Sequence, residues 1–216
     1  MWLAFRSCTL ALMAIFLIRH GLASAGVDDL DPGLDPIGHA QARATAEAFR
    51  SVNVGRLVVS PLRRTRETAA PIATLLGIEP EIREEVAEVF DPTMPADERK
   101  AMIGPFMAGR WTDQPEALRA WRKRVVSTLI GMGITAAASG QELVVVSHYI
   151  AIGVAVGVAL SDDRVVPVPI PNCSITVVEA GRLGLKLLAA ATTAHLTEDL
   201  VTGLRTALPG GGPATG

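Results

Sequence analysis

Three apolar runs in this sequence end in side chains that could bind or attack an anion. The three sets are Arg19-His20, Ser60 with Arg64 one helical turn further on, and Ser147-His148. Imidazoles act as nucleophiles or proton donors, and guanidinium groups bind oxyanions through paired hydrogen bonds. Alone, each set has an ordinary explanation, such as a buried, hydrogen-bonded histidine or a surface arginine on a helix. Gathered in one place, they would form an anion pocket with two imidazoles and two guanidiniums.

The runs before these side chains have the composition of strands that are buried on both faces. They are Ile15 to Ile18, Arg56 to Val59 and Glu142 to Val146, all rich in β-branched or large apolar residues. In an open parallel sheet, the ligand crevice lies beyond the carboxyl ends of the strands. We therefore expect the three sets to meet at one edge of a sheet, with Gly21 letting the backbone turn away there.

Two helices are expected next to the first two strands. Asp35-Pro36 has the form of an N-cap followed by proline at the first helical position, and this helix should continue to about Arg50. A second helix is expected over residues 60–76, with Gly77 as its C-cap. A strand, a crossover helix and a strand form a right-handed βαβ unit, which places both strand ends on one side of the sheet.

The rest of the chain is expected to complete the sheet and add a helical insertion. We expect a short edge strand within residues 78–89, helices over 96–109, 114–138 and 150–160, and a hairpin of strands at 174–179 and 183–189. The insertion, at about residues 92–139, should lie over the carboxyl edge of the sheet, with Trp111 and Trp121 as packing anchors. Residues 208–216, rich in glycine and proline, are expected to form a disordered tail.

The composition favours one domain and gives no sign of a nucleic-acid partner. The 216 residues are enough for one buried core, and 20 Lys and Arg against 22 Asp and Glu leave a net charge of −2. Cys8 and Cys173 are too few for a disulfide framework, and the four histidines lack metal-type spacing. We expect a cytoplasmic protein with no metal, no membrane partner and no nucleic-acid partner.

The first residues have two interpretations. The apolar run Leu10 to Leu17 resembles the hydrophobic part of a signal peptide, with Ala23-Ser24-Ala25 as the small-residue cleavage site. Cleavage there would remove Arg19 and His20 together with the strand that carries them. We instead expect residues 1–12 to be an extension from an upstream start codon and residues 13–207 to form a single domain.

Together these segments resemble the motifs of the histidine phosphatase superfamily, the phosphoglycerate mutase-like proteins. The matching segments are Arg19-His20-Gly21, Leu34-Asp-Pro-Ile-Gly-His-Ala-Gln-Ala, Ser60-Pro-Leu-Arg-Arg-Thr-Arg-Glu-Thr-Ala and Val145-Val-Ser-His148, and more weakly Val86-Ala-Glu88-Val and Asn172-Cys-Ser-Ile-Thr. They follow the family's order and spacing from about Met13 to about His195. The resemblance implies an α/β fold, a three-layer α/β/α sandwich around a mostly parallel sheet, and no cofactor.

The resemblance also implies a role for each cationic residue of the site. His20 is the nucleophile and forms a phosphohistidine that water then hydrolyses. Arg19 and Arg64 hold the phosphoryl oxygens. His148 binds the same phosphoryl group as a charged donor.

The proton donor is assigned by a weaker match. Glu88 fits the family's Leu-x-Glu pattern and would protonate the leaving oxygen, with Glu84 and Glu85 as alternatives. Four further residues stay outside the proposed chemistry: Arg63, Arg66 and His39 as surface side chains, and His195 as an indirect support.

Departures from the family pattern bear on the substrate. In mutases and sugar bisphosphatases, Arg-His-Gly is followed by Glu or Gln, then Thr or Ser, and soon by Asn. Here Leu22-Ala-Ser24 follows, and Gly26 stands where that Asn is expected, which favours a phosphatase. The short phosphohistidine phosphatases lack the long segment present here as residues 85–140. We expect the helices of this segment, with Arg110 and Trp111, to select the substrate.

We therefore expect a metal-independent phosphomonoesterase that acts on a small-molecule phosphoester or a phosphoprotein. The alternatives are phosphoglycerate mutase-like phosphotransfer, a non-catalytic module that binds phosphorylated ligands, and a secreted phosphatase. Binding alone does not need a nucleophilic imidazole, so the presence of His20 with both arginines argues for catalysis.

Overall fold

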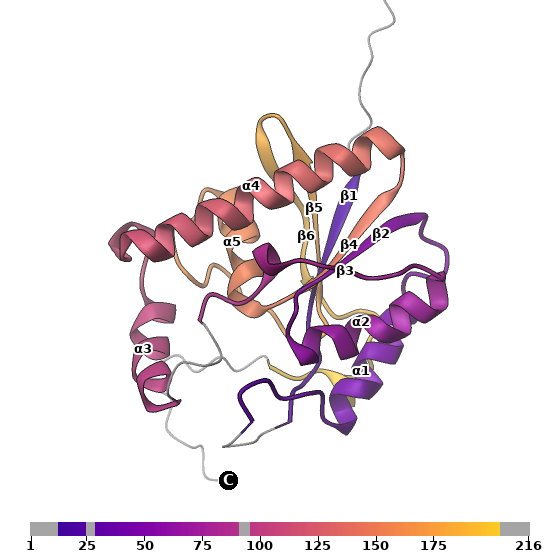
Figure 1. Ribbon diagram of the computed structural model, residues 1–216, viewed down its shortest axis with the longest axis horizontal. Coiled ribbons are helices and arrows are strands. Elements are labelled where there is room, and N and C mark those ends of the chain that lie inside the picture. The colour runs from indigo at the N-terminus through magenta and orange to yellow at the C-terminus, as the bar shows by residue number, and fades with distance from the viewer. Residues whose placement is uncertain (1–12, 25–28, 91–95, 204–216) are drawn as a thin grey trace, which may run out of the picture.

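The computed structural model describes residues 13–24, 29–90 and 96–203. Six strands form one sheet in the order β3-β2-β4-β1-β5-β6 (Figure 1). Their bounds are β1 Ala14–Arg19, β2 Val54–Val59, β3 Glu81–Ile82, β4 Glu142–Ser147, β5 Ile175–Gly181 and β6 Gly184–Thr192. The expected extension at residues 1–12, Gly26, Pro92 and the expected tail lie outside the described residues.

The four strands that lead toward the expected site run parallel. β1 and β2 both pair with β4 in parallel, and β3 pairs in parallel with the outer side of β2. β5 is antiparallel to β1, and β6 is antiparallel to β5, which confirms the expected hairpin. Val145 of β4 faces Leu17 of β1 on one side and Val58 of β2 on the other. The last of the parallel strands in sequence therefore lies in the middle of the sheet.

Helices cover both faces of this sheet and confirm the expected three-layer α/β/α architecture (Figure 1). On one face lie α1 Pro36–Glu47 and α2 Arg63–Leu76, and on the other lie α4 Glu116–Ser139 and α5 Tyr149–Leu160. α3 Ala96–Ala108 follows at the side of the molecule, and short 3₁₀ turns span Glu84–Val86, Trp111–Asp113 and Glu198–Leu200. The fold is thus α/β with a mostly parallel sheet.

The helix ends follow the local signals in the sequence. The carboxylate of Asp35 accepts a hydrogen bond from the Gly38 amide at 2.6 Å, which caps α1. Gly77 ends α2 in the left-handed conformation, with φ of 65°. α1 is shorter than expected because Arg50 already lies in a turn, and α2 begins at Arg63 because residues 61 and 62 form a bend.

The insertion takes a different place from the one expected. α4 packs along one face of the sheet, where Val125 and Leu129 belong to the same core as Leu17. The expectation that the insertion lies over the carboxyl edge is therefore wrong for its longest helix. Substrate selection by this segment stays a prediction, but the side chain of Trp111 is not available for direct contact with a substrate, because it is 1% exposed and stacks on Trp121, with ring centroids 6.0 Å apart. Its apolar surface is used for packing, as the other expectation for Trp111 had it.

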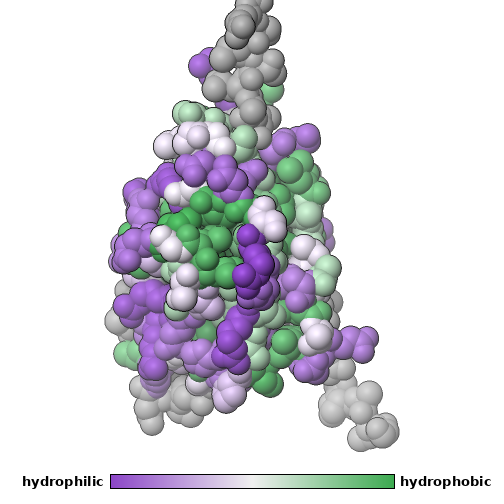
Figure 2. Space-filling view, turned by 90° about the vertical axis from the view of Figure 1, so that its right-hand side faces the viewer, coloured by the Kyte–Doolittle hydropathy of each residue, from purple (hydrophilic) through white to green (hydrophobic). Residues whose placement is uncertain are grey.

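Apolar surface is exposed on the side of the molecule that faces right in Figure 1. Figure 2 shows a hollow there that is lined with hydrophobic residues and surrounded by hydrophilic ones.

None of the helices within the described residues combines the length and the apolar composition that a membrane-spanning helix needs.

Candidate active site

Backbone pairing brings the three strand ends together at one edge of the sheet. The amide of His20 donates to the carbonyl of Ser147 at 3.0 Å, and the amide of Ser60 donates to the carbonyl of Val146 at 3.1 Å. β4 therefore holds the ends of β1 and β2 on its two sides, and His148 follows directly after it. The expected convergence of the three sets is confirmed by this register.

His20 is held in one orientation by its own loop. Its Nδ1 lies 2.8 Å from the carbonyl oxygen of Gly21. Because a carbonyl only accepts, Nδ1 carries the proton and Nε2 carries the lone pair. Burial, followed by the charges of Arg19 and Arg64, lowers the pKa of His20 well below its ordinary value. The ring is therefore neutral at physiological pH and has the form that a nucleophile needs.

His148 lies beside His20 at the centre of the site. The two ring centroids are 5.3 Å apart, and Nε2 of His148 is hydrogen-bonded to Oγ of Ser60 at 2.7 Å. Its Nδ1 is buried and has no hydrogen-bond partner among the described residues. Burial, and then the charges of His20, Arg64 and Arg19, lower the pKa of His148 well below its ordinary value. The expected charged donor thus needs the field of a bound dianion, since the imidazole is neutral on its own.

Arg19 is fixed by groups on two neighbouring segments. Its Nη1 donates to the carbonyl of Ile170 at 2.6 Å, and its guanidinium carbon lies 4.9 Å from the ring centre of Tyr149. Its Nε is buried without a hydrogen-bond partner in the described chain. Burial lowers the pKa of Arg19, and Tyr149 raises it, but a guanidinium keeps its charge in either case. Arg19 therefore provides a fixed positive charge close to His20.

Arg64 reaches the same site from the first turn of α2. Its side chain is only 15% exposed, and its Nη1 lies 3.6 Å from a carboxylate oxygen of Asp31. Arg64 also contributes to the lowered pKa values of both histidines, which places its charge close to their rings. Its neighbours Arg63 and Arg66 are exposed, and Arg63 pairs with Glu67 at 2.7 Å, as expected for surface side chains.

Glu88 is the acidic residue that shares this environment. Its two carboxylate oxygens accept from the amide of Val89 at 2.9 Å and from that of Ile150, in the first turn of α5, at 3.5 Å. Burial raises the pKa of Glu88, and these amides and the two arginines offset only part of that effect. A raised pKa favours the protonated form that a proton donor needs.

The two alternative acids lie in different surroundings. Glu85 pairs with Arg83 at 3.0 Å, and this pairing lowers the pKa of Glu85. Glu84 is exposed to solvent. Neither contributes to the pKa shifts of Arg19 or His20, whereas Glu88 raises that of Arg19.

The loop after the nucleophile is held against α1 and α2. The amide of Gly21 donates to Oγ1 of Thr68 at 3.0 Å, and the amide of Leu22 donates to Oε1 of Gln41 at 2.8 Å. A Cβ on Gly21 would lie 2.7 Å from the carbonyl oxygen of Gly38, so this close approach of two backbones requires glycine. The Gly-x-x-Gln pattern of α1 thus positions the loop that follows His20.

A late segment clamps the same residues from the other side. The side-chain amide of Asn172 donates to the carbonyl of His20 at 3.1 Å, and the amide of Cys173 donates to the carbonyl of Arg19 at 3.0 Å. Cys173 adopts a φ of 54°, which is uncommon for a residue with a Cβ. Burial raises the pKa of its thiol to about 12, so the thiol does not act as a nucleophile. His195 supports this segment by a contact from Nε2 to the carbonyl of Cys173 at 3.1 Å.

Some of these contacts were not expected from the sequence. Tyr149 directly follows His148, and its ring contacts the guanidinium group of Arg19, a contact that no motif in the sequence indicates. His39 lies on the exposed face of α1, 3.8 Å from Glu67, as expected for a surface residue. Among the described residues, no three His, Cys, Asp or Glu side chains form a group that could hold a metal ion.

The sequence matches a known protein family over most of the chain. The family described as the histidine phosphatase superfamily (branch 1) matches residues 15–193. The chain belongs to this superfamily. The match includes the segments of all five residues assigned to the site from the sequence, from Arg19 to His148.

The individual proteins that this chain resembles share less than a third of its residues at aligned positions. A Yersinia enterocolitica protein named as a probable phosphoglycerate mutase, GpmB, is 28% identical over 212 residues, which cover 86% of this chain and 95% of that protein. Phosphoserine phosphatase from Entamoeba histolytica, solved with 3-phosphoglyceric acid, has a TM-score of 0.66 at 23% identity, covering 86% and 100% of the two chains. Bacillus stearothermophilus YhfR has a TM-score of 0.70 at 16% identity, covering 85% and 98%. At these identities the two structures show a shared fold.

Proposed function

We propose that this histidine phosphatase family member hydrolyses phosphate monoesters through a phosphohistidine on His20. The observation that carries the proposal is the state of His20, a neutral imidazole whose Nδ1 is occupied by the Gly21 carbonyl and whose pKa is lowered by burial and by the charges of Arg19 and Arg64. A phosphate monoester is a dianion, so Arg19 and Arg64 would bind it and reduce the repulsion that an attacking lone pair meets.

The first half of the reaction transfers the phosphoryl group to the protein. Nε2 of His20 forms a bond to phosphorus while the bond from phosphorus to the ester oxygen breaks. Protonated Glu88 gives its proton to the departing oxygen, which leaves as an alcohol. The dianion raises the proton affinity of His148, so that its Nδ1 can donate to a phosphoryl oxygen.

The second half restores the free site. Glu88, now a carboxylate, accepts a proton from a water molecule as that water attacks the phosphorus atom. The bond from nitrogen to phosphorus breaks, and inorganic phosphate leaves. The nucleophile and the acid have then both returned to their starting states.

The decisive test uses His20→Ala with His39→Ala as the matched control. We expect His20→Ala to lose p-nitrophenyl phosphate hydrolysis and His39→Ala, a change at the exposed surface of α1, to retain it. Wild type quenched during turnover of a ³²P-labelled substrate should carry label that is stable in alkali and lost in acid, as expected of a phosphoramidate. Unchanged turnover by His20→Ala would overturn the proposal, and tight phosphate binding without turnover by wild type would favour a binding module.

A second candidate is transfer of the phosphoryl group between two hydroxyls of one substrate, as in a phosphoglycerate mutase. The similarity to a probable phosphoglycerate mutase supports this candidate. Against it, Leu22 and Ala23 follow the nucleophile and offer no polar side chain to hold a second substrate group. Incubation with 2- and 3-phosphoglycerate separates the two, because a mutase interconverts them and a phosphatase releases inorganic phosphate.

We further propose that the substrate is a small phosphorylated molecule, with a phosphoprotein as the alternative. One structural relative is a phosphoserine phosphatase solved with 3-phosphoglyceric acid, and another is named glucosyl-3-phosphoglycerate phosphatase, both from the same fold. A panel of phosphorylated metabolites and phosphohistidine proteins, assayed with wild type and His20→Ala, would identify the class that His20 turns over.

A further inference from the structure

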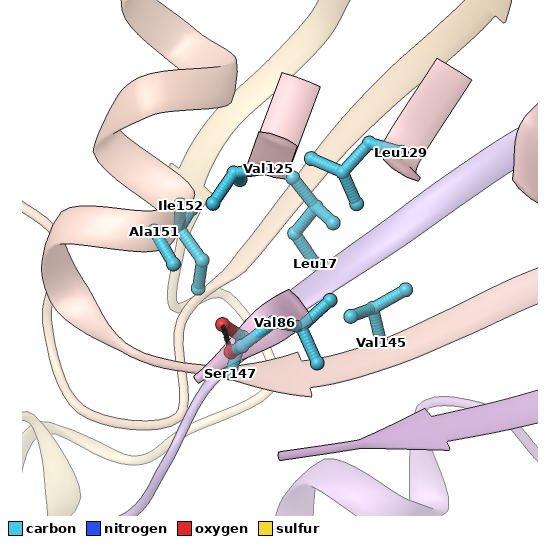
Figure 3. Close-up of a pocket in the computed structure, with 8 residues that line it drawn as sticks. All are labelled: Leu17, Val86, Val125, Leu129, Val145, Ser147, Ala151 and Ile152. Atoms are coloured by element: carbon cyan, nitrogen blue, oxygen red, sulfur yellow. Dashed lines mark hydrogen bonds between the residues drawn. The ribbon is translucent and has the colours of Figure 1, made fainter. Parts of the chain in front are cut away.

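Ser147 contacts both halves of the proposed site from the end of β4. Its carbonyl accepts the amide of His20 at 3.0 Å. Its Oγ donates to the carbonyl of Val86 at 2.7 Å, in a hydrogen bond that is buried and joins residues 61 positions apart (Figure 3). One residue thus links the strand that ends in the nucleophile to the turn that leads to Glu88.

The turn that leads to Glu88 is anchored in the core at Val86. Val86 lies in the 3₁₀ turn Glu84–Val86, two residues before Glu88, and its side chain is buried in the core. Beyond that turn, the Glu88 carboxylate accepts from the amide of Ile150 at 3.5 Å. The bond from Ser147 is shorter and fixes the backbone itself. It therefore fixes the position of the backbone that leads to the Glu88 side chain.

The surroundings of this bond offer no replacement for it. A small cavity borders Ser147 and Val86, and its other lining side chains are all apolar: Leu17, Val125, Leu129, Val145, Ala151 and Ile152 (Figure 3). Without the Ser147 hydroxyl, the buried Val86 carbonyl would lose its donor, the side chains that line the cavity supply no other, and the carbonyl would be driven to move toward another partner. The cavity leaves space for such a movement.

We propose that Ser147 is a positioning residue that holds Glu88 in reach of the oxygen leaving the phosphoryl group on His20. The inference rests on the proposed function, in which Glu88 is the proton donor. A shift of the turn by a fraction of an ångström would increase the distance between the Glu88 carboxyl group and the leaving oxygen. The arginines and His20 would stay in place.

The test compares Ser147→Thr with Ser147→Val, two side chains of the same shape that differ in the hydroxyl. Both variants add one methyl group to a residue that borders the cavity, so any cost of packing is shared by the two. Glu88→Gln serves as the reference for a lost proton donor. Val145→Ala, which removes apolar contacts at the same cavity without touching the hydrogen bond, is the control for a change in packing alone.

The readout is the ratio of kcat/KM for an alkyl phosphate to kcat/KM for 2,4-dinitrophenyl phosphate. An alkoxide needs a proton to leave and dinitrophenolate does not, so the ratio reports proton donation and cancels general losses of activity. We expect Glu88→Gln to lower the ratio by about 100-fold or more, and Ser147→Val by about 10-fold to 100-fold. Ser147→Thr and Val145→Ala should keep the ratio of wild type.

Two outcomes distinguish a failure of the inference about Ser147 from a failure of the proposed role of Glu88. If Glu88→Gln lowers the ratio and Ser147→Val does not, the positioning role of Ser147 is wrong and the role of Glu88 stands. If Glu88→Gln leaves the ratio unchanged, the assignment of Glu88 is wrong, and the inference about Ser147 fails with it. A drop in the ratio for Val145→Ala equal to that of Ser147→Val would show a packing effect and overturn the specific role of the hydroxyl.

Discussion

The imidazole rings of His20 and His148 lie 5.3 Å apart, centre to centre, and are inclined by 59° to each other. Burial lowers the pKa of both, so two adjacent histidines stay neutral while Arg19 and Arg64 carry the positive charge of the site. The proposed tasks are thereby divided between residue types. In the proposed reaction, the arginines would bind the dianion at every physiological pH, and the lone pair of His20 would stay available for attack.

The pH dependence of kcat/KM should follow from the opposite shifts of His20 and Glu88. The lowered pKa of His20 keeps the nucleophile neutral below the ordinary histidine value of 6.5, so activity should persist into mildly acidic solution. The pKa of Glu88, raised from 4.5, should set the loss of activity as pH rises and the acid is deprotonated. Glu88→Gln should be slow and should lack this alkaline limb, in profiles corrected for substrate ionisation. An alkaline limb unchanged in Glu88→Gln would assign it to another group.

Stability should fall as solution becomes more acidic, partly because of His148. The unfolded chain binds a proton near the ordinary histidine pKa of 6.5, whereas the folded chain resists protonation of this buried ring. The unfolded state then holds more protons, so the free energy of unfolding rises with pH in the range below about 6.5. His148→Gln should reduce this slope by up to about 1.4 kcal/mol per pH unit, measured by urea unfolding at several pH values. His39→Gln, at the surface, is the control, and equal slopes for the two variants would contradict the prediction.

Arg64 should contribute to phosphate binding through its planar guanidinium, and its helix provides a matched control. Arg64→Lys keeps the charge but loses paired donation to an oxyanion, so we expect KM and the inhibition constant of vanadate to rise about 10-fold, equivalent to ~1.4 kcal/mol. Arg66→Lys, the same change at an exposed position of α2, should leave both unchanged. Unchanged constants in Arg64→Lys would show that Arg64 acts through its charge alone, and an equal rise in both variants would show that the effect is not specific to Arg64.

Gly38 should be indispensable to the loop that carries the nucleophile. A Cβ at this position would lie 2.1 Å from the carbonyl oxygen of Leu22, and neither backbone can yield easily. We expect Gly38→Ala to lower the free energy of unfolding by roughly 1–3 kcal/mol and to reduce kcat. Gly131→Ala in α4 meets no atom within 4 Å and should raise stability by about 0.5–1 kcal/mol. Urea unfolding of both variants, with kcat measured alongside, provides the comparison, and a stable, active Gly38→Ala would contradict it.

Much of the site could be predicted because its residues are placed by strand periodicity. Arg19, Ser60 and His148 each end an apolar run, and the carboxyl ends of parallel strands share one edge of a sheet. Asp35 and Gly77 likewise carry local capping signals that the structure confirms. These features depend on near neighbours in the chain, which a sequence displays directly.

Other features depend on which distant segments meet, and the sequence does not display this. The bond from Ser147 to Val86 and the contact of Tyr149 with Arg19 arise only after β4 and α5 have been placed. Trp111 shows the same limit, because an aromatic residue in a segment near the site was compatible with both packing and substrate contact. The structure buries it against Phe106, with ring centroids 5.6 Å apart.

The central place of β4 has a consequence for how the protein is made. β1 and β2 leave the ribosome first, yet they do not pair with each other, because β4 is the strand between them. A nascent chain that ends before Glu142 therefore has no means of bringing His20 and Ser60 together through the sheet. Such pairing over long sequence separations is slow relative to local structure formation. We therefore expect the proposed phosphate site to form late in synthesis, and a growing chain to have no phosphatase activity until its central strand has emerged and inserted.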